Sequence, residues 1–402
     1  MILVDQTKKF KTVLITLKFK AEASRETFAF RTLLPSVLRA KTNLYKNRKV
    51  FNEKLEEMYS ASLTSNTNKI GRLSVIHLQL KLVNPVLVDE ALFEEGLKFM
   101  REYVYGHNQF SQKDFEVEKR LLLEEVISKE NDKTRYALTR LFDEMCKDEL
   151  YGARVAGTKE QIEALTLAQF KKSYQSFLKN DELQIILSGD VNEAQVKLAE
   201  TYFPNASFNQ TDFLDYETKS VESVTEIIEQ DKISQTKLNI GYRLPVRQGD
   251  SLHTAAVLFN AALGGYVHSR LFLNVREKHS LCYYISSVYD AYKGLMFLYS
   301  GVDAKRLDLA IKVIDDEVNK MMTTKISEKE LNLSKQALIN DLKESEDSQG
   351  ARQNVLYIQA LLNKKASLEE RIAKINAVTP DQLLEVGKLL VKDTVYLLDV
   401  ER

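Results

Sequence analysis

The alternation of apolar and polar positions along the chain predicts short strands set among longer helical stretches. Apolar runs typical of strands cover Thr12 to Phe19 and Leu183 to Leu187, with longer helical segments between them. Helices and strands alternate unevenly along the sequence. This favours an α+β fold over a regular succession of parallel βα units.

Three kinds of segment recur in the same order at a nearly constant separation, which is the sign of an internal duplication. Ser111 to Lys119 aligns with Ser327 to Lys335, at an offset of 327 − 111 = 216. In both, a serine precedes a helix with acidic residues in its first turn. Ile162 to Phe170 aligns with Ile375 to Leu383, at an offset of 375 − 162 = 213, and a threonine opens each helix.

The strands at the two ends of each copy complete the duplication. A strand followed by a helix occurs near Val13 to Phe19 and again from Lys237 to Tyr242, and the closing strand Leu183 to Leu187 matches Thr394 to Leu398. We therefore expect two homologous α+β domains, residues 1–207 and 223–402. The polar, aperiodic segment 208–222 is the predicted linker.

Composition removes several classes of function. The chain is 44% hydrophobic and 28% charged, and its 57 basic residues balance 57 acidic ones, so no global field favours nucleic acid or an anionic membrane. No apolar run is long enough for a membrane span, and the first residues lack a signal-peptide core. Cys146 and Cys282 form no CxxC pattern, and we expect free thiols in a cytoplasmic protein, with Cys282 a buried small apolar residue rather than a nucleophile.

No catalytic motif is complete in itself. Two imidazoles on one helix face, four residues apart, are the usual start of a helical zinc site, and no pair of histidines here has that spacing. A G-x-S-x-G elbow, a P-loop and a G-x-G-x-x-G turn are also absent. The histidines are His77, His107, His253, His268 and His279.

A resemblance becomes specific in the second half of the chain. The run LGGYVHSRLFLNVREKHSLCY, from Leu263 to Tyr283, reads as a Gly-Gly break, a helix from Ser269 to about Lys278 and a strand from Cys282. It resembles the signature of the pitrilysin/insulinase family of zinc metallopeptidases, which includes the mitochondrial processing peptidases. Residues 151–166 and 188–191 resemble further segments of that family. The resemblance thus covers nearly the whole chain and implies mostly antiparallel sheets, each with helices packed on one face.

The zinc motif of that family is degenerate in this chain. Active members hold zinc through a helical H-x-x-E-H in the first half and a glutamate on a later helix. The resemblance places Thr32 and Ser36 on the two histidines and Pro35 on the general base. Hydroxyl groups are not credible zinc ligands at neutral pH. Glu118 and Glu125 match two acidic positions of the later helix, and we expect them to be solvated or salt-bridged carboxylates rather than a metal site.

The second half retains a pair of residues that resembles a substrate clamp. The resemblance implies that Arg276 can hydrogen-bond a peptide carbonyl and that the Tyr283 hydroxyl can stabilise the oxyanion of a tetrahedral intermediate. From Arg270 we expect a structural ion pair.

The sequence is compatible with three functions. The first is a zinc-free, inactive-type bacterial subunit that forms a heterodimer with a homologue bearing H-x-x-E-H, in which zinc is held only by the partner and the substrate is a peptide. The second is a homodimeric scaffold or peptide-binding protein with no role in proteolysis. The third, an independent enzyme with a relocated metal site, is the least favoured. Neither nucleic acid nor a membrane is an expected partner.

Overall fold

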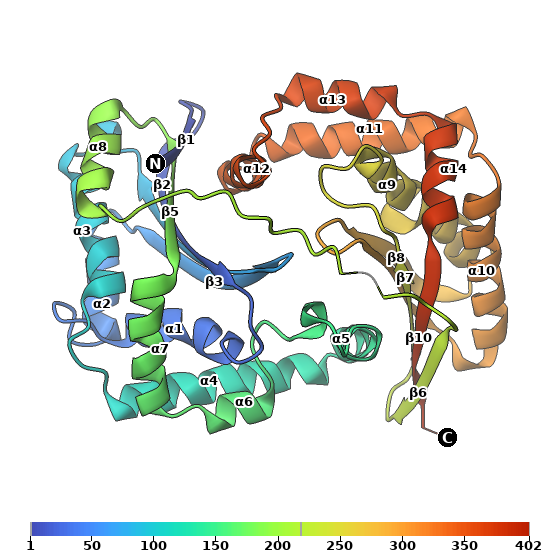
Figure 1. The fold of residues 1–402 in the computed structure, drawn as a ribbon, viewed down its shortest axis with the longest axis horizontal. Coiled ribbons are helices and arrows are strands. Elements are labelled where there is room, and N and C mark those ends of the chain that lie inside the picture. The colour runs from blue at the N-terminus through green and yellow to red at the C-terminus, as the bar shows by residue number, and fades with distance from the viewer. Residues whose placement is uncertain (1, 218, 402) are drawn as a thin grey trace. The chain divides into compact units, whose positions relative to one another are not determined.

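Two five-stranded mixed sheets organise the protein, which is represented by a computed structural model covering residues 2–217 and 219–401 (Figure 1). The first sheet has the order β1-β5-β2-β4-β3 and the second the order β6-β10-β7-β9-β8. The strands are β1 (Ile2–Gln6), β2 (Thr12–Glu22), β3 (Ser62–Ile70), β4 (Leu73–Val83), β5 (Glu182–Gly189), β6 (Thr225–Asp231), β7 (Thr236–Arg243), β8 (Cys282–Asp290), β9 (Leu295–Val302) and β10 (Val391–Val400).

The helices follow the same duplicated plan. The α-helices are α1 (Phe28–Ala40), α2 (Arg48–Glu57), α3 (Ala91–Tyr105), α4 (Gln112–Asn131), α5 (Lys133–Met145), α6 (Lys159–Ala164), α7 (Leu167–Asn180), α8 (Glu193–Tyr202), α9 (His253–Asn260), α10 (Leu307–Thr323), α11 (Glu328–Ser345), α12 (Gln349–Leu361), α13 (Leu368–Ala377) and α14 (Pro380–Leu389). Short 3₁₀ or π turns are η1 (Pro85–Leu87), η2 (Leu150–Gly152), η3 (Ala261–Gly265), η4 (Phe272–Lys278) and η5 (Ala304–Arg306).

The two sheets have the same topology, which confirms the predicted α+β fold with two homologous domains. In each sheet the first strand pairs in parallel with the last, β1 with β5 and β6 with β10, and the other pairings are antiparallel. The sequence pattern had not indicated β1 or β6. Both are edge strands whose residues are partly exposed, so their apolar signal is weak.

The helix starts confirm the aligned caps. The Ser111 hydroxyl accepts a hydrogen bond from the backbone N–H of Asp114, and Ser327 caps α11 in the same way. Thr166 and Thr379 each form a full capping box, at α7 and α14. Each cap satisfies backbone donors that a helix start leaves unpaired, so the same residue types recur where the duplicated helices begin.

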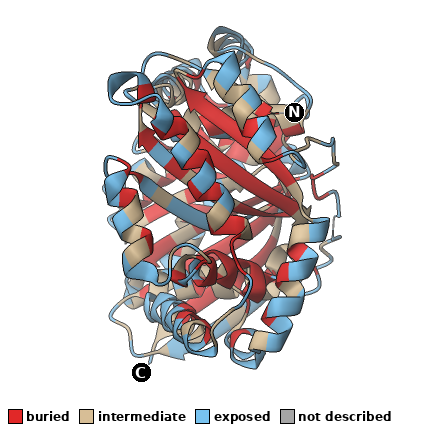
Figure 2. Ribbon diagram, turned by 90° about the vertical axis from the view of Figure 1, so that its left-hand side faces the viewer, coloured by how far each residue is buried: buried red, intermediate tan, exposed pale blue. Residues whose placement is uncertain are grey.

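One face of each sheet forms the main apolar core with the surrounding helices. In β2 the alternate residues Val13, Ile15, Leu17 and Phe19 are buried in the first core, and the residues between them point to the opposite face. Figure 2 shows buried residues concentrated on the strands and on the inward sides of the helices. The sheets therefore have a second face, which also needs a cover.

The compact units are not continuous in sequence. The first consists of Met1–Ser128, Ala153–Phe213 and Glu346–Lys364, and the second of Lys129–Gly152, Leu214–Ser345 and Lys365–Arg402. Helix α12, from late in the chain, thus belongs with the first sheet, and α5, from the first half, with the second (Figure 1). The two helices are equivalent in the duplication, since α12 starts 349 − 133 = 216 residues after α5.

This arrangement bears on the predicted domains. The boundaries 1–207 and 223–402 describe the duplicated halves and stay a prediction, whereas the compact units exchange one helix each. Residue 218 of the predicted linker 208–222 lies outside the described residues.

Polar side chains attach α12 to the second face of the first sheet. The Gln353 side chain accepts hydrogen bonds from Thr16 Oγ1 at 2.9 Å and from Gln79 Nε2 at 3.0 Å. The Tyr357 hydroxyl donates to Gln184 Oε1 at 2.8 Å, and both side chains are fully buried. A buried polar face is stable only where its groups are paired, so α12 fits this sheet by its hydrogen bonds.

Buried charges attach the segment around α5 to the second sheet. Glu149, just after α5, lies 2.7 Å from Arg243 and 2.6 Å from Lys293, and all three residues are buried. The backbone also approaches closely, because a Cβ on Gly241 would lie 2.4 Å from Met145 Sδ. Removing one partner of a buried ion pair leaves the other charge uncompensated, so substitution of either residue should destabilise this attachment.

Within residues 2–217 and 219–401, no helix is both long and apolar enough to cross a membrane.

The hydroxyl of Tyr357 offers a direct test of the α12 attachment. Tyr357→Phe leaves the buried side-chain oxygen of Gln184 without its donor, so we expect the free energy of unfolding to fall by about 1–3 kcal/mol. Urea denaturation followed by circular dichroism measures the change. Asn354→Ala, at an exposed position of the same helix, is the matched control and should change stability by less than about 0.5 kcal/mol. Equal midpoints for Tyr357→Phe and wild type would contradict the role given to this hydrogen bond.

Candidate functional site

Helix α1 carries Thr32, Pro35 and Ser36, the positions that the resemblance places on the zinc motif, and the first two pack or bond within the fold. The Thr32 hydroxyl donates to the Val155 carbonyl at 2.6 Å, Pro35 is buried, and Ser36 is exposed. Because Pro35 has no N–H, the carbonyl of Arg31 loses its helical donor, and the Thr67 hydroxyl of β3 donates to it at 3.0 Å instead. The helix therefore continues through a proline because a neighbouring strand replaces the missing bond.

The donor set at these positions does not fit zinc. Thr32 and Ser36 offer hydroxyl groups, Pro35 offers no side-chain donor atom, and the carbonyl of Pro35 accepts a hydrogen bond from the Tyr103 hydroxyl at 2.9 Å. Zinc sites are built from thiolate, imidazole and carboxylate. Elsewhere in the described chain, no group of three or more such side chains could hold a metal ion.

The two matched glutamates lie on α4, in different environments. Glu118 is buried, and its carboxylate lies 2.6 Å from the guanidinium of Arg48 on α2. Glu125, two turns further along the helix, is exposed. The charge of Glu118 is thus balanced by an arginine from within the same unit.

Arg276 and Tyr283 flank the turn between η4 and β8. Arg276 lies in a π-helical turn, with its guanidinium 4.6 Å from the centre of the Phe272 ring. Tyr283 sits where the pairing of β8 with β9 shifts register, and it is 79% exposed. Bulges re-aim a side chain and π turns are frequent at functional sites, so the local backbone presents this tyrosine to solvent.

The charge of Arg276 affects the pKa of the neighbouring thiol of Cys282, at the start of β8. Burial raises the pKa of Cys282, and a hydrogen bond with Ser300 and the positive charge of Arg276 offset part of that rise. The other cysteine, Cys146, is fully buried, and burial raises its pKa to about 12. Both cysteines are free thiols, as predicted, but Cys282 is half-buried rather than buried. Neither environment favours a thiolate nucleophile.

The Gly-Gly break holds this turn against the sheet. A Cβ on Gly264 would lie 2.7 Å from Ser287 Oγ, and the Ser286 hydroxyl donates to the Gly264 carbonyl at 3.1 Å. Ser287 likewise donates to the carbonyl of Asn260 at 3.3 Å. The glycine thus allows η3 to touch β8, which fixes the segment that carries Arg276.

Arg270 makes the ion pair expected of it. Its Nε lies 2.8 Å from Glu330 Oε1, and its Nη2 lies 3.3 Å from the second oxygen. Burial alone would raise the pKa of Glu330, but hydrogen bonds from Arg270 and Ser327 outweigh it and bring the value to about 2. The pair joins the signature segment to α11.

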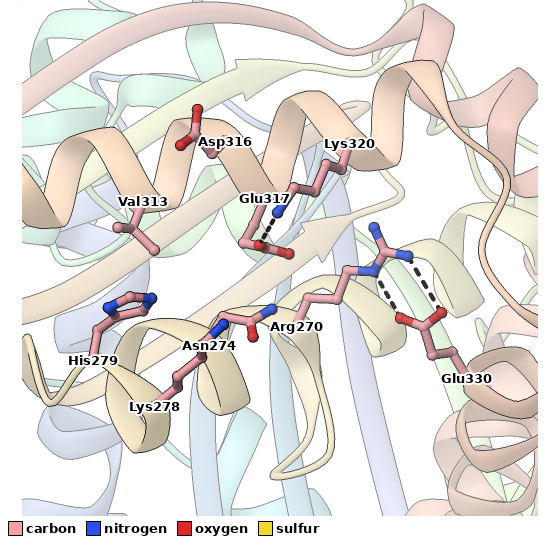
Figure 3. Close-up of a pocket in the computed structure, with 9 residues that line it drawn as sticks. All are labelled: Arg270, Asn274, Lys278, His279, Val313, Asp316, Glu317, Lys320 and Glu330. Atoms are coloured by element: carbon pink, nitrogen blue, oxygen red, sulfur yellow. Dashed lines mark hydrogen bonds and ion pairs between the residues drawn. The ribbon is translucent and has the colours of Figure 1, made fainter.

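A polar cavity of about 460 Å³ lies beside this ion pair, and the sequence had not indicated it. Figure 3 shows the Glu317–Lys320 and Arg270–Glu330 pairs within it. Its lining comes from η4, α10 and α11, with neighbouring residues, so no local motif could have revealed it. The lining residues are Arg270, Asn274, Lys278, His279, Val313, Asp316, Glu317, Lys320 and Glu330.

The site residues therefore fall into two groups. Thr32, Pro35, Ser36 and the two glutamates belong to the first unit, where α1 and α4 serve its packing. Arg276 and Tyr283 belong to the second unit, where one is half-buried and the other exposed.

Comparisons with known proteins identify the family to which the chain belongs. A family model described as "Peptidase M16 inactive domain" matches residues 164–338. The "Probable inactive metalloprotease YmfF" of Bacillus subtilis (strain 168) is 31% identical, over 98% of this chain and 94% of that protein. The "Uncharacterized zinc protease YmxG" of the same organism is 23% identical, over 71% of this chain and 70% of its own length.

Solved structures agree in fold. A conserved protein from Enterococcus faecalis V583 superposes with a TM-score of 0.93 and 30% identity, covering 99% of this chain and 96% of that one. A peptidase M16 inactive domain from Pseudomonas fluorescens gives a TM-score of 0.81 at 19% identity, covering 99% and 94%. The similarity to YmfF extends over almost the whole chain, and the zinc ligands are replaced. The chain therefore belongs to the peptidase M16 (pitrilysin) family, as an inactive-type member that lacks the zinc motif.

Proposed function

We propose that this chain is the non-catalytic subunit of a two-subunit peptidase and pairs with a homologue that bears H-x-x-E-H. The observation that carries the proposal is the unequal fate of the two halves. Side chains at the zinc positions are used inside the first unit, whereas the second keeps Arg276 and an exposed Tyr283 on an irregular backbone. At 79% exposure, the Tyr283 hydroxyl is accessible to a substrate from solvent.

The chemistry of the retained pair suits a peptide substrate. The guanidinium of Arg276 can donate charge-assisted hydrogen bonds to a peptide carbonyl and so position the chain. The Tyr283 hydroxyl can donate to the oxyanion that develops when that carbonyl is attacked. The metal and the general base would have to come from the partner, because Thr32, Pro35 and Ser36 offer neither a zinc ligand nor a general base.

The alternative is a homodimeric scaffold or peptide-binding protein with no role in proteolysis. It shares the family and the fold with the first proposal. It differs in one consequence, because a scaffold does not depend on the Tyr283 hydroxyl.

Removal of the clamp tests the proposal. In a complex with the H-x-x-E-H homologue, we expect Tyr283→Phe to lower kcat about 100-fold, the usual effect of losing one oxyanion donor. Arg276→Ala should lower kcat/KM by at least about tenfold. Initial rates on a fluorogenic peptide measure both effects, and gel filtration checks that each variant still forms the complex.

The matched control is Tyr59→Phe, which removes a hydroxyl from another exposed tyrosine, 51% exposed, in the first unit. It should leave kcat unchanged. If no complex forms, or if the complex keeps full activity with Tyr283→Phe and Arg276→Ala, the scaffold function stands and the clamp does not.

Metal content gives a second prediction. Because Thr32, Pro35 and Ser36 provide no zinc ligand, we expect the chain purified alone to carry far less than one zinc per molecule. Elemental analysis by mass spectrometry, with the H-x-x-E-H homologue prepared in parallel as a positive control, measures this. One zinc per chain that survives dialysis would favour a relocated metal site instead.

A further inference from the structure

The second face of the first sheet carries a row of polar side chains across four strands. Lys18 of β2 pairs in register with Gln184 of β5 on one side and with His77 of β4 on the other, and His77 pairs with Asn66 of β3. Residues paired in register point to the same face of a sheet. The row therefore runs Gln184, Lys18, His77, Asn66.

Lys18 and its neighbour Lys20 lie on this face in contrasting surroundings. Both are buried, with 6% and 4% of their surface exposed. Lys20 lies 2.9 Å from the Glu182 carboxylate and donates to the Asn209 carbonyl and the Thr211 hydroxyl, each at 2.9 Å. Its charge is compensated in the usual way for a buried lysine.

Lys18 has no such compensation. In the part of the chain that the structure describes, its ammonium forms no ion pair or hydrogen bond, and its contact is with the face of the Tyr357 ring, 3.8 Å from the centroid. Burial lowers the pKa of Lys18 to about 8, so it is largely protonated at neutral pH. Burying an ammonium without a counterion is costly, which makes it a poor choice for a purely structural position.

Access to this ammonium is set by its neighbours. On one side Tyr357 covers the sheet and donates to Gln184, so those two groups are already paired. On the other side His77 is half-buried and Asn66 is exposed, so exposure along the row increases toward β3, the edge strand of the sheet. Burial and the charge of Lys18 lower the pKa of His77 to about 4, and its neutral ring keeps one N–H to donate.

We propose that Lys18 and His77, with Asn66 at the rim, form a binding site for a carboxylate. One ammonium matches one negative charge, and the imidazole N–H and the amide supply the hydrogen bonds that a carboxylate accepts. The carboxylate can belong to a small organic acid or to the C-terminus of a peptide. Every residue involved belongs to the first unit, so the site does not depend on the proposed partner subunit.

The test uses the full chain alone, without a partner. Isothermal titration calorimetry compares three probes: acetate, acetyl-trialanine with a free C-terminus, and the same peptide as its C-terminal amide. We expect the free-acid peptide to bind one per chain and the amide to bind at least tenfold more weakly. Acetate that matches the acid peptide identifies a small carboxylate as sufficient, whereas binding of the acid peptide alone identifies the peptide C-terminus.

Two variants separate the site from nonspecific charge. Lys18→Met removes the ammonium at nearly constant volume and should weaken binding of the acid peptide at least tenfold. Lys81→Met, at an exposed lysine on the same face of β4, should leave binding unchanged. The thermal midpoint of ligand-free Lys18→Met should equal or exceed that of wild type, because the variant removes a buried charge that has no counterion and keeps an apolar side chain against the Tyr357 ring. A structural role for Lys18 would lower it.

The pH dependence provides a further check. Near Lys18 the other ionisable groups are His77, Tyr357, and the Lys20–Glu182 pair. His77 is neutral above about pH 4, and burial raises the pKa of Tyr357, so it also stays neutral. Glu182 is ionised, because its hydrogen bonds outweigh burial and lower its pKa. Affinity for the acid peptide should therefore fall above about pH 8, as Lys18 loses its proton.

Three results would overturn the site. They are no binding of either carboxylate, equal binding of the acid and amide peptides, or unchanged binding by Lys18→Met.

Discussion

A five-stranded sheet has two faces, and the whole arrangement depends on how the second one is covered. In the first unit the apolar face packs on its own helices, and α12, from the other half of the sequence, covers part of the second face. Its Gln353 and Tyr357 side chains pair with polar groups of three strands. In the second unit α5 plays the same part, followed by the buried charge of Glu149. Each sheet is complete only with a helix from the other half of the chain.

Polar groups are also paired around the positions that the resemblance places on the zinc motif. Pro35 deprives the Arg31 carbonyl of its donor, and Thr67 supplies one. The hydroxyl of Thr32 bonds the Val155 carbonyl, and Glu118 is paired with Arg48. The positions that the resemblance places on the zinc motif thus make hydrogen bonds or packing contacts within the first unit, whereas Tyr283 in the second unit is exposed. This contrast between paired side chains in the first unit and an exposed tyrosine in the second is the basis of the proposed function.

Much of the fold could be predicted from the sequence because it is written in local signals. The Thr166 and Thr379 capping boxes and the strands beginning at Thr12 and Cys282 depend on neighbouring residues only. The family signature likewise located Arg276 and Tyr283. The exchange of α5 and α12 could not be predicted, since an amphipathic helix does not specify which sheet it covers.

The carboxylate site at Lys18 was hidden for a related reason. Lysines at alternate positions of β2 look like ordinary polar residues of a strand. The tertiary structure reveals that Lys20 has a counterion, whereas among the described residues Lys18 has none. The bulge that exposes Tyr283 is also invisible in the sequence, because it arises from the register between two strands. Local chemistry can be predicted, but the pairing of distant groups has to be seen.

Reconstitution with a partner shows whether this chain supplies half of an active site, as we propose. The peptidase activity of a homologue bearing H-x-x-E-H is measured alone and during titration with this chain. We expect activity to rise with added chain and to saturate at one chain per homologue. A homologue that is fully active alone, with a rate that this chain does not change, would contradict it.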